Sequence, residues 1–359
     1  MKYQQTLDLL CQLIRCQPVS ADIPAVNRAT DTLRRYLDAA GLHTAVETFD
    51  GRDVLFAATR PGKQHRLLLN AHLDVVPPSA PGQFEPAVRD GRLYGRGASD
   101  CLGNAVAIAQ ALIQAGPQAD AAAFFTADEE IGGATTEAMF NAGYRHTELA
   151  VVCDIADFGL LAVAQKGILV FELTAHGRGG HSATPWCFDN PIATLANALA
   201  KLSREWTNPT ADDAWHDSCT PCILTAGSAN NQIPDTATVT LNCRYTTPGD
   251  EQRIAERIKA ITGLDDLKLV HHCVPVTCDP DAPAIRRLVD ALQQARPTQP
   301  VRKIRMDGAT DARHLAAAGL PVAIIGVDGD GCHSACEFLR LDALDLAIDT
   351  LAHFARSCN

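Results

Sequence analysis

The residues best able to do chemistry in this chain are acidic residues and histidines that follow short apolar runs. His72 and Asp74 follow the run 67–69, and Asp128, Glu129 and Glu130 follow the run 122–126. Asp154 follows the run 149–153, and His333 lies beyond the run 321–327. Such runs are typical of buried strands, and the carboxyl ends of parallel strands meet at one edge of a sheet. Carboxylates at that density repel one another unless a cation neutralises them. Histidines combined with carboxylates therefore predict a catalytic site for zinc or a similar divalent ion.

A further candidate ligand, Asp100, ends the segment LYGRGASD, in which Gly95 and Gly97 allow a sharp turn just before a helix. Taken singly, each of these acidic residues is better explained as a surface or capping carboxylate. Their coincidence at several strand ends favours the metal site.

The neighbouring residues Glu129 and Glu130 need separate roles. Adjacent side chains at a strand end diverge, so one carboxylate can bind a metal ion while the other takes the proton of a metal-bound water. This division predicts metal-assisted hydrolysis, with a free carboxylate as general base and then general acid.

Strands and helices alternate along most of the chain. Helical patterns cover 7–14, 25–40, 103–115, 136–142 and 311–318, between or beside the apolar runs. Alternation of this kind predicts an α/β fold with a doubly wound, mostly parallel sheet.

The stretch 167–273 has a different pattern. It reads strand, helix, strand, strand, helix, strand, with segments at 168–175, 190–206, 223–226, 236–245, 250–262 and 267–273. This βαββαβ order predicts an inserted ferredoxin-like domain. The catalytic domain would then comprise 1–166 and 274–359.

Composition limits the class of protein. The chain has 359 residues, 47% of them hydrophobic, and a net charge of -11 without any block of like charge. These values indicate a folded protein and argue against nucleic acid or a membrane as its partner. Residues 1–14 form neither a signal peptide nor a membrane span, so we expect a cytoplasmic protein whose thirteen cysteines are reduced.

Eight segments resemble the di-zinc hydrolases that include acetylornithine deacetylase, succinyl-diaminopimelate desuccinylase, aminoacylase and bacterial glutamate carboxypeptidase. They are NAHLDVVP, GRLYGRGASDCLG, TADEEIGG, VVCD, GRGGHSATP, NNQIPDTATVTLNCR, GATDARHLAAAGLP and CHSACEFL. The segments follow the order of the family and span nearly the whole chain.

The resemblance implies a zinc-peptidase-like fold and two zinc ions, for which cobalt or manganese could substitute. The implied ligands are a bridging Asp100, His72 and Asp154 for one ion, and Glu130 and His333 for the other. Asp74 would lie behind His72. Glu129 would be the general base for a metal-bridging water that attacks an amide bond.

The same resemblance implies that 167–273 is a lid and dimerisation domain of a homodimer, with His181 acting across the interface. Asn231 and Arg244 would also face the substrate. Gly308, Thr310 and Arg313 match a segment that contacts its carboxylate end. The implied substrate is a small N-acyl amino acid or a short peptide.

Three departures from the family pattern matter. Trp186, which follows Ala183-Thr184-Pro185, could line the substrate pocket or be a packed aromatic of the inserted domain. Cys101 and the residues after it replace a Met-Lys-Gly-Gly-like run, which we expect to change loop packing rather than the metal site. Asp154 replaces the glutamate of the deacylase branches and is more similar to the aminopeptidase and dipeptidase branches. A dipeptidase or aminopeptidase, which would require a free α-amino group, is therefore the alternative function.

The sequence disfavours two other classes of protein. An inactive binding module is disfavoured because every ligand position and the base are filled. A thiol redox protein built on Cys219 and Cys222 would act without metal. No second Cys-x-x-Cys pair follows in the sequence, so buried or loop thiols are the favoured interpretation.

Overall fold

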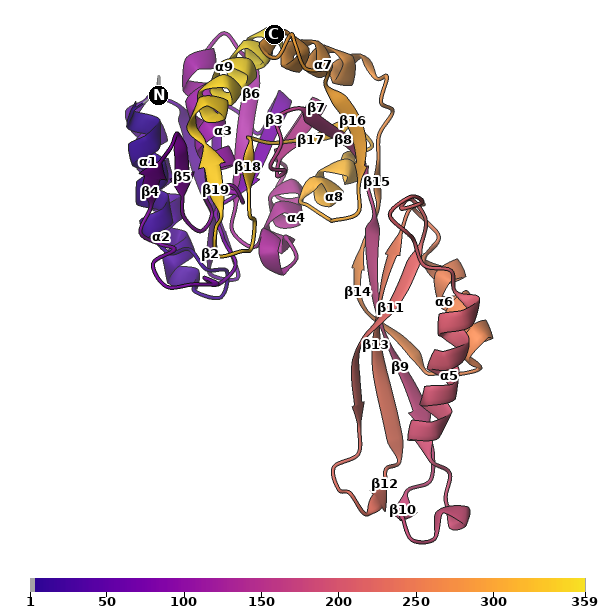
Figure 1. Cartoon of the computed structure of the whole chain (residues 1–359). Coiled ribbons are helices and arrows are strands. Elements are labelled where there is room, and N and C mark those ends of the chain that lie inside the picture. The colour runs from indigo at the N-terminus through magenta and orange to yellow at the C-terminus, as the bar shows by residue number, and fades with distance from the viewer. Residues whose placement is uncertain (1–3, 359) are drawn as a thin grey trace. The chain divides into compact units, whose positions relative to one another are not determined.

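A computed structural model describes residues 4–358, which form two compact units (Figure 1). The first unit contains the chain up to Val163, Cys278–Ile304 and the chain from Thr310 onward. The second contains Ala164–Thr277 together with Arg305–Ala309. Gly308, which the sequence places in the catalytic domain, thus belongs to the second unit.

The first unit is built on a large sheet with parallel strands at its centre. Its strands run in the order β1 (His43–Phe49), β2 (Arg52–Ala58), β6 (Ala121–Thr126), β3 (Gln64–His72), β7 (Arg145–Cys153), β17 (Val322–Ile325) and β8 (Leu160–Gln165). The pairs from β6 to β17 are parallel, and the strands on either side are antiparallel. The last two residues of β8, Ala164 and Gln165, belong to the second unit, where they pair with β15 (Val276–Thr277). The strand β16 (Arg302–Met306) also pairs with β8.

Helices bury the central strands. Leu67 and Leu69 of β3 belong to the main apolar core, and Leu68 between them is also buried, so both faces of this strand are covered. The core is shared with α1 (Gln4–Arg15), α2 (Ile23–Ala39), α3 (Leu102–Ala115), α7 (Pro283–Ala295) and α9 (Leu341–Ser357). Two shorter helices, α4 (Ala134–Asn141) and α8 (Ala312–Leu315), pack against β6 and β17. The mixed α/β architecture is the one that the sequence predicts.

A small antiparallel sheet supports the loops of the first unit. Its strands are β18 (Gly329–Asp330), β19 (Phe338–Arg340), β5 (Arg92–Tyr94) and β4 (Ala87–Arg89), in that order. Asp100 follows β5, and His333 lies in the connection between β18 and β19. Pairing of β5 with β19 therefore joins the segments that carry these two residues.

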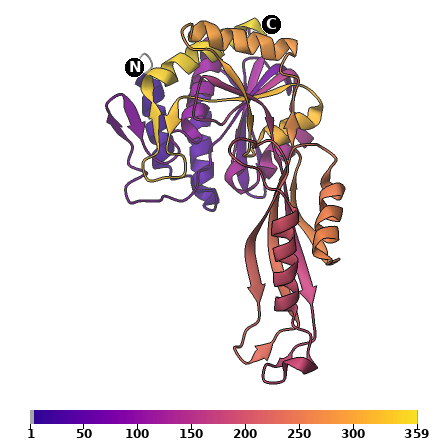
Figure 2. The same cartoon turned by 45° about the vertical axis from the view of Figure 1, so that its right-hand side comes forward.

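The second unit contains the predicted order of elements. They are β9 (Gly167–His176), α5 (Pro191–Glu205), β11 (Ser218–Ala226), β13 (Thr236–Tyr245), α6 (Glu251–Thr262) and β14 (Leu267–Cys273). The strands form an antiparallel sheet in the order β11, β13, β9, β14. Figure 2 shows α5 lying along this sheet. At one end, β10 (Gly180–His181) pairs with β12 (Gln232–Ile233).

Several elements were not predicted. The sequence patterns missed β1, β2, β8 and the long C-terminal helix α9. The predicted helix at 311–318 is shorter, since α8 ends at Leu315 and one turn of 3-10 helix, Ala316–Ala318, follows. Among residues 4–358, no helix has both the length and the apolar character needed to cross a membrane.

Candidate active site

The five predicted metal ligands all lie in the first unit, and the structure brings them together. His72 is the last residue of β3, and Asp154 directly follows β7. Glu130 lies in the 3-10 turn Glu129–Ile131 after β6. Because β3, β6 and β7 are parallel neighbours, their carboxyl ends supply these three side chains at one edge of the sheet.

Asp100 lies between two histidines. Its Oδ1 atom is 3.0 Å from Nε2 of His72, and its Oδ2 atom is 3.2 Å from Nε2 of His333. Asp154 Oδ1 is 3.5 Å from the same nitrogen of His72, and Glu130 Oε1 is 3.2 Å from that of His333. The carboxylate of Asp100 thus joins two groups, each of which holds one histidine and one further carboxylate.

Backbone contacts fix the tautomer of His72. Its Nδ1 atom is 2.8 Å from the backbone carbonyl oxygen of Asp74. A carbonyl oxygen can only accept a hydrogen bond, so Nδ1 carries the proton. The other ring nitrogen, Nε2, faces Asp100 at 3.0 Å and is the nitrogen left to bind a metal ion once it loses its proton.

The Asp74 carboxylate holds the turn that carries both glutamates. It accepts hydrogen bonds from the backbone N–H groups of Glu129, at 3.1 Å, and Glu130, at 3.3 Å, and from Ser20 Oγ at 2.7 Å. Its Oδ1 atom is 3.5 Å from Nδ1 of His72. Asp74 is fully buried, so it positions both the histidine and the glutamates.

The buried ion pair of Arg96 and Glu337 supports the loop before Asp100. The sequence did not predict this pair. Glu337 accepts hydrogen bonds from the backbone N–H groups of Gly97, Ser99 and Asp100, and Arg96 NH1 lies 2.7 Å from it. Both charged side chains are at most 1% exposed. Arg96 and Glu337 lie within the segments GRLYGRGASDCLG and CHSACEFL, but nothing local in either segment indicates that they pair.

The charges of the site fit a divalent cation. Burial raises the pKa of Glu130 to about 7 and that of Asp154 to about 6. Burial and the charge of Asp154 raise the pKa of Glu129 to about 9, and the hydrogen bond to Asp100 raises that of His333 to about 9. Without a metal ion, protons must neutralise this crowded set. A cation would replace them, and imidazole and carboxylate are donors that zinc, cobalt and manganese accept.

A thiol also lies close to this set. The Sγ atom of Cys101 is within 4.8 Å of ligand atoms of His72 and Asp154. It donates a hydrogen bond of 2.8 Å to the carbonyl oxygen of Cys153, and burial raises its pKa to about 12. Metal binding needs a thiolate, so these contacts disfavour Cys101 as a ligand.

Arg313 approaches the predicted general base. Its NH1 atom is 3.7 Å from Oε1 of Glu129, and it also donates a hydrogen bond of 3.1 Å to the carbonyl oxygen of Thr310. The side chains of Arg313 and Glu129 are 5% and 11% exposed. Of the predicted substrate residues, Thr310 and Arg313 therefore lie in the first unit, and Arg313 is near Glu129.

Asp311, between Thr310 and Arg313, is buried and holds the 310–313 segment in place. The sequence alone did not indicate this role. Its Oδ2 atom accepts hydrogen bonds from Thr126 at the end of β6 and from Thr136 in α4, at 2.7 and 2.6 Å. A Cβ atom at Gly133, which has a φ of 66°, would lie 2.3 Å from Oδ1 of Asp311. The glycine thus allows the 310–313 segment to pack against the turn after β6.

His181 and Asn231 lie together at one end of the second unit. His181 pairs with Gln232 between β10 and β12, and Ser182 donates a backbone hydrogen bond to the carbonyl oxygen of Asn231. Arg244 is near the opposite end of β13, opposite Ser218. Eight residues of extended strand separate Thr236 from Arg244, which corresponds to roughly 26 Å.

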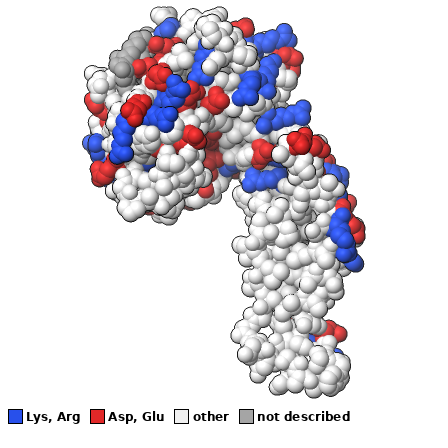
Figure 3. All heavy atoms as spheres, viewed as in Figure 1, with Lys and Arg blue, Asp and Glu red and all other residues white. Residues whose placement is uncertain are grey.

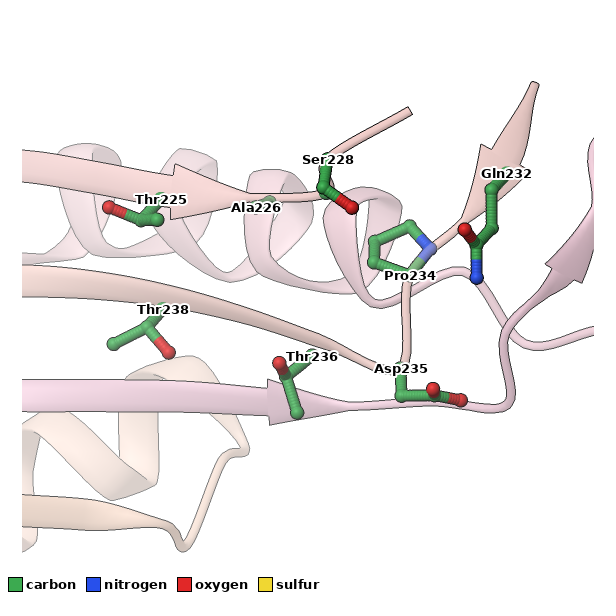
Figure 4. A pocket seen from close by; sticks show the side chains of 9 residues that line it. Thr225, Ala226, Ser228, Gln232, Pro234, Asp235, Thr236 and Thr238 are labelled. Atoms are coloured by element: carbon green, nitrogen blue, oxygen red, sulfur yellow. The ribbon is translucent and has the colours of Figure 1, made fainter. Parts of the chain in front are cut away.

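A pocket of about 370 Å³ lies next to the loop of His181 and Asn231 (Figure 4). Hydroxyl groups of Thr225, Ser228, Thr236 and Thr238 line it, together with other residues that include Gln232 and Asp235. Asp235 Oδ1 also accepts a hydrogen bond of 2.8 Å from Gly179 N–H, which ties down the chain before His181. The lining contains neither histidine nor cysteine, so the pocket lacks a metal ligand set.

Comparison with known proteins gives a consistent result. The model of "Peptidase family M20/M25/M40" matches residues 68–357. A succinyl-diaminopimelate desuccinylase of Xanthomonas campestris pv. campestris is 30% identical over 369 residues, covering 94% of this chain and 95% of that protein. A tripeptidase structure from Staphylococcus aureus has a TM-score of 0.80 at 18% identity, covering 99% of this chain and 98% of the other. A dinuclear metal-binding peptidase of Bacillus subtilis has a TM-score of 0.73 at 16% identity, with coverages of 99% and 98%.

Proposed function

Because the chain belongs to peptidase family M20/M25/M40 and is a metal-dependent amidohydrolase, we propose that it hydrolyses the amide bond of a small N-acylated amino acid. The observation that carries the proposal is the position of Asp100, whose two oxygens face different histidines. Glu129, the proposed base, lies in the adjoining turn beside Glu130. The desuccinylase relative makes N-succinyl amino acids the first substrates to test.

Each residue of the site has a chemical task in this proposal. Two divalent ions held by His72, Asp100, Glu130, Asp154 and His333 would polarise the carbonyl oxygen and lower the pKa of a water molecule. Glu129 takes the proton from the attacking water and delivers it to the nitrogen as the C–N bond breaks. The products are a carboxylate and an amine. His181 donates a hydrogen bond to the oxyanion that develops on the carbonyl oxygen.

We propose that polar side chains bind the rest of the substrate. A guanidinium binds a carboxylate through two parallel hydrogen bonds, so Arg244 and Arg313 are proposed to hold the substrate carboxylate. The residues proposed to complete the contacts are Asn231, Gly308 and Thr310. The position of Arg313 beside Glu129 supports a second task, which is to hold the base in place.

The spacing within the second unit supports a homodimer. A substrate of amino-acid size cannot touch both His181 and Arg244 of one copy, because about 26 Å of strand lies between their ends of the sheet. If both residues serve one substrate, they come from different copies of the chain. This spacing supports the proposal that His181 acts in the site of the partner.

The surface of the second unit is compatible with a partner. Few charged side chains occur along most of the face seen in Figure 3. On the edge strand β11, Ile223 and Leu224 are 61% and 56% exposed. An unpaired strand edge with exposed apolar side chains is a surface suited to contact with a second chain.

A dipeptidase or aminopeptidase remains the second candidate. Asp154 in place of the glutamate of the deacylase branches favours it. The two activities differ in whether the substrate must carry a free α-amino group.

The test is a substrate screen with protein reconstituted with zinc, cobalt or manganese. We expect hydrolysis of N-acetyl or N-succinyl amino acids, loss of activity after chelation, and recovery when metal is restored. Preference for unmodified dipeptides would favour the second candidate. Metal-independent hydrolysis, or no hydrolysis of either substrate class, would contradict the proposal.

A further inference from the structure

Two buried cysteines of the second unit face each other across neighbouring strands. Cys219 on β11 is directly opposite Cys243 on β13 in an antiparallel register. The side chain of Asn208 bonds both backbone groups of Cys219, with N–H to Oδ1 at 2.8 Å and Nδ2 to the carbonyl oxygen at 3.4 Å. The backbone of Cys219 therefore points away from β13, which makes the two cysteines a non-hydrogen-bonded pair.

This kind of pair brings side chains closest together. Cα atoms in non-hydrogen-bonded antiparallel pairs are about 4.5 Å apart, within the range of about 4.4 to 6.8 Å that a disulfide spans. Both side chains belong to the apolar core of the second unit, and they are 2% and 0% exposed. The neighbouring thiol of Cys219, together with burial, raises the pKa of Cys243. Both thiols are free.

The sequence suggests a different pair, Cys219 with Cys222, and the fold rules it out. Both residues lie on the extended strand β11. Three residues of strand separate their Cα atoms by about 10 Å, beyond the limit of about 7 Å for a disulfide. Cys222 is exposed at a register shift, where its thiol donates a hydrogen bond to the carbonyl oxygen of Thr220.

We propose that Cys219 and Cys243 form a dithiol modification site that a low-molecular-weight disulfide, such as glutathione disulfide, oxidises to a cross-strand disulfide. One cysteine thiolate attacks the oxidant, which forms a mixed disulfide and releases one thiol. The second cysteine thiolate then attacks the protein sulfur of that mixed disulfide and releases a second thiol. The protein loses two electrons and two protons, and the oxidant is reduced to two thiols.

The edge of the sheet gives the oxidant access. Within residues 4–358, β11 is an end strand of its sheet and pairs only with β13. Beyond Pro221, two residues after Cys219, a register shift interrupts the pairing of β11 with β13. Local opening of this part of the strand exposes Cys219 without unfolding the whole unit. The disulfide then ties the edge strand to its neighbour and raises the melting temperature.

The experiment treats the folded, metal-loaded protein with glutathione disulfide, blocks free thiols by alkylation and maps the peptides without reduction. Cleavage before aspartates separates Cys219 and Cys222, within 217–234, from Cys243, within 235–249. We expect these two peptides to appear cross-linked and two hydrogen masses lighter. We also expect the melting temperature to rise by several degrees and to fall again after dithiothreitol. Metal content should not change.

Two variants identify the partner of Cys243. Cys222→Ser should retain the cross-link, and Cys219→Ser should lose it while keeping its metal content. If Cys219→Ser does not fold, Cys219→Ala replaces it in the same experiment. A cross-link that persists without Cys219 would overturn the proposal. The proposal would also be overturned if the cross-link did not form in the folded wild-type protein, or if it formed only in denaturant.

Discussion

Arg313 NH1 lies 3.7 Å from Oε1 of Glu129, and both side chains are nearly buried. The guanidinium therefore has a partner within the protein before any substrate carboxylate arrives. A carboxylate paired in this way keeps its orientation, which a general base needs. This contact with the base distinguishes Arg313 from Arg244, the other arginine proposed to recognise the substrate, whose Nε donates a hydrogen bond of 3.2 Å to Oδ1 of Asn242.

This difference gives a prediction for the two arginines. Arg244→Ala should raise KM for a substrate with a free carboxylate by about 10- to 100-fold and should have little effect on the C-terminal amide. Arg313→Ala should lower kcat for both substrates, because Glu129 loses its partner. Wild-type rates that are equal for acid and amide would reject carboxylate recognition by either residue.

Glu129 and Glu130 should respond differently to the same conservative change. We expect Glu129→Gln to keep both metal ions and to lose turnover by about 10² to 10⁴-fold, since an amide cannot accept the proton. Glu130→Gln should weaken metal binding instead. Metal titration and single-turnover kinetics on both variants measure the difference, and identical phenotypes would show that the assigned roles are wrong.

Asp100→Ala should abolish binding of both ions, because its two oxygens face the two histidine groups. Metal analysis after reconstitution should find two ions per chain in the wild type and fewer than one in the variant. Asp189→Ala, which removes an exposed carboxylate of the second unit, is the control and should bind two. A wild-type protein that never binds more than one ion would contradict the two-metal site.

His146 should make the protein less stable in mild acid. It is buried, neither ring nitrogen has a hydrogen-bond partner, and burial lowers its pKa to about 4. Between pH 6.5 and pH 4 the unfolded chain binds a proton there that the folded chain does not, so stability falls as pH falls. The loss amounts to at most about 3 kcal/mol.

Urea unfolding at pH 7.5 and pH 5 measures this effect. His146→Leu should show a smaller loss of stability between the two pH values than the wild type. His353→Gln, which changes an exposed histidine, should behave like the wild type. Equal losses in all three proteins would exclude His146 as the source.

Mixed dimers test the role of His181. Inactive His181→Ala and inactive Glu129→Gln subunits, once re-associated, should recover part of the activity, because one composite site would contain both natural residues. Removal of one oxyanion donor costs about 10² to 10³-fold in turnover, so recovery is easy to detect. If subunits exchange without recovery, His181 acts within its own chain or has no catalytic part.

Local sequence was sufficient to predict the position of a site residue where that residue ends or directly follows a buried strand. The run 67–69 predicts β3, and His72 ends that strand; Asp154 follows β7 in the same way. Apolar runs and strand ends are properties of neighbouring residues, so the sequence alone determined which side chains share an edge of the sheet. The strand β1 was missed because it lies at the edge, is only partly buried and lacks a clear apolar pattern. The buried apolar run 54–58 of β2, by contrast, is a signal from which that strand could have been predicted.

Tertiary structure decided which of these groups meet. The two oxygens of Asp100 face His72 and His333 only because β5 pairs with β19, which lies more than 240 residues further along the chain. Register between β11 and β13 likewise pairs Cys219 with Cys243, whereas the local Cys-x-x-Cys spacing suggests Cys222. Spacing along a chain describes neighbours in sequence, but contacts across strands depend on register, which turns, bulges and the burial of one face determine together.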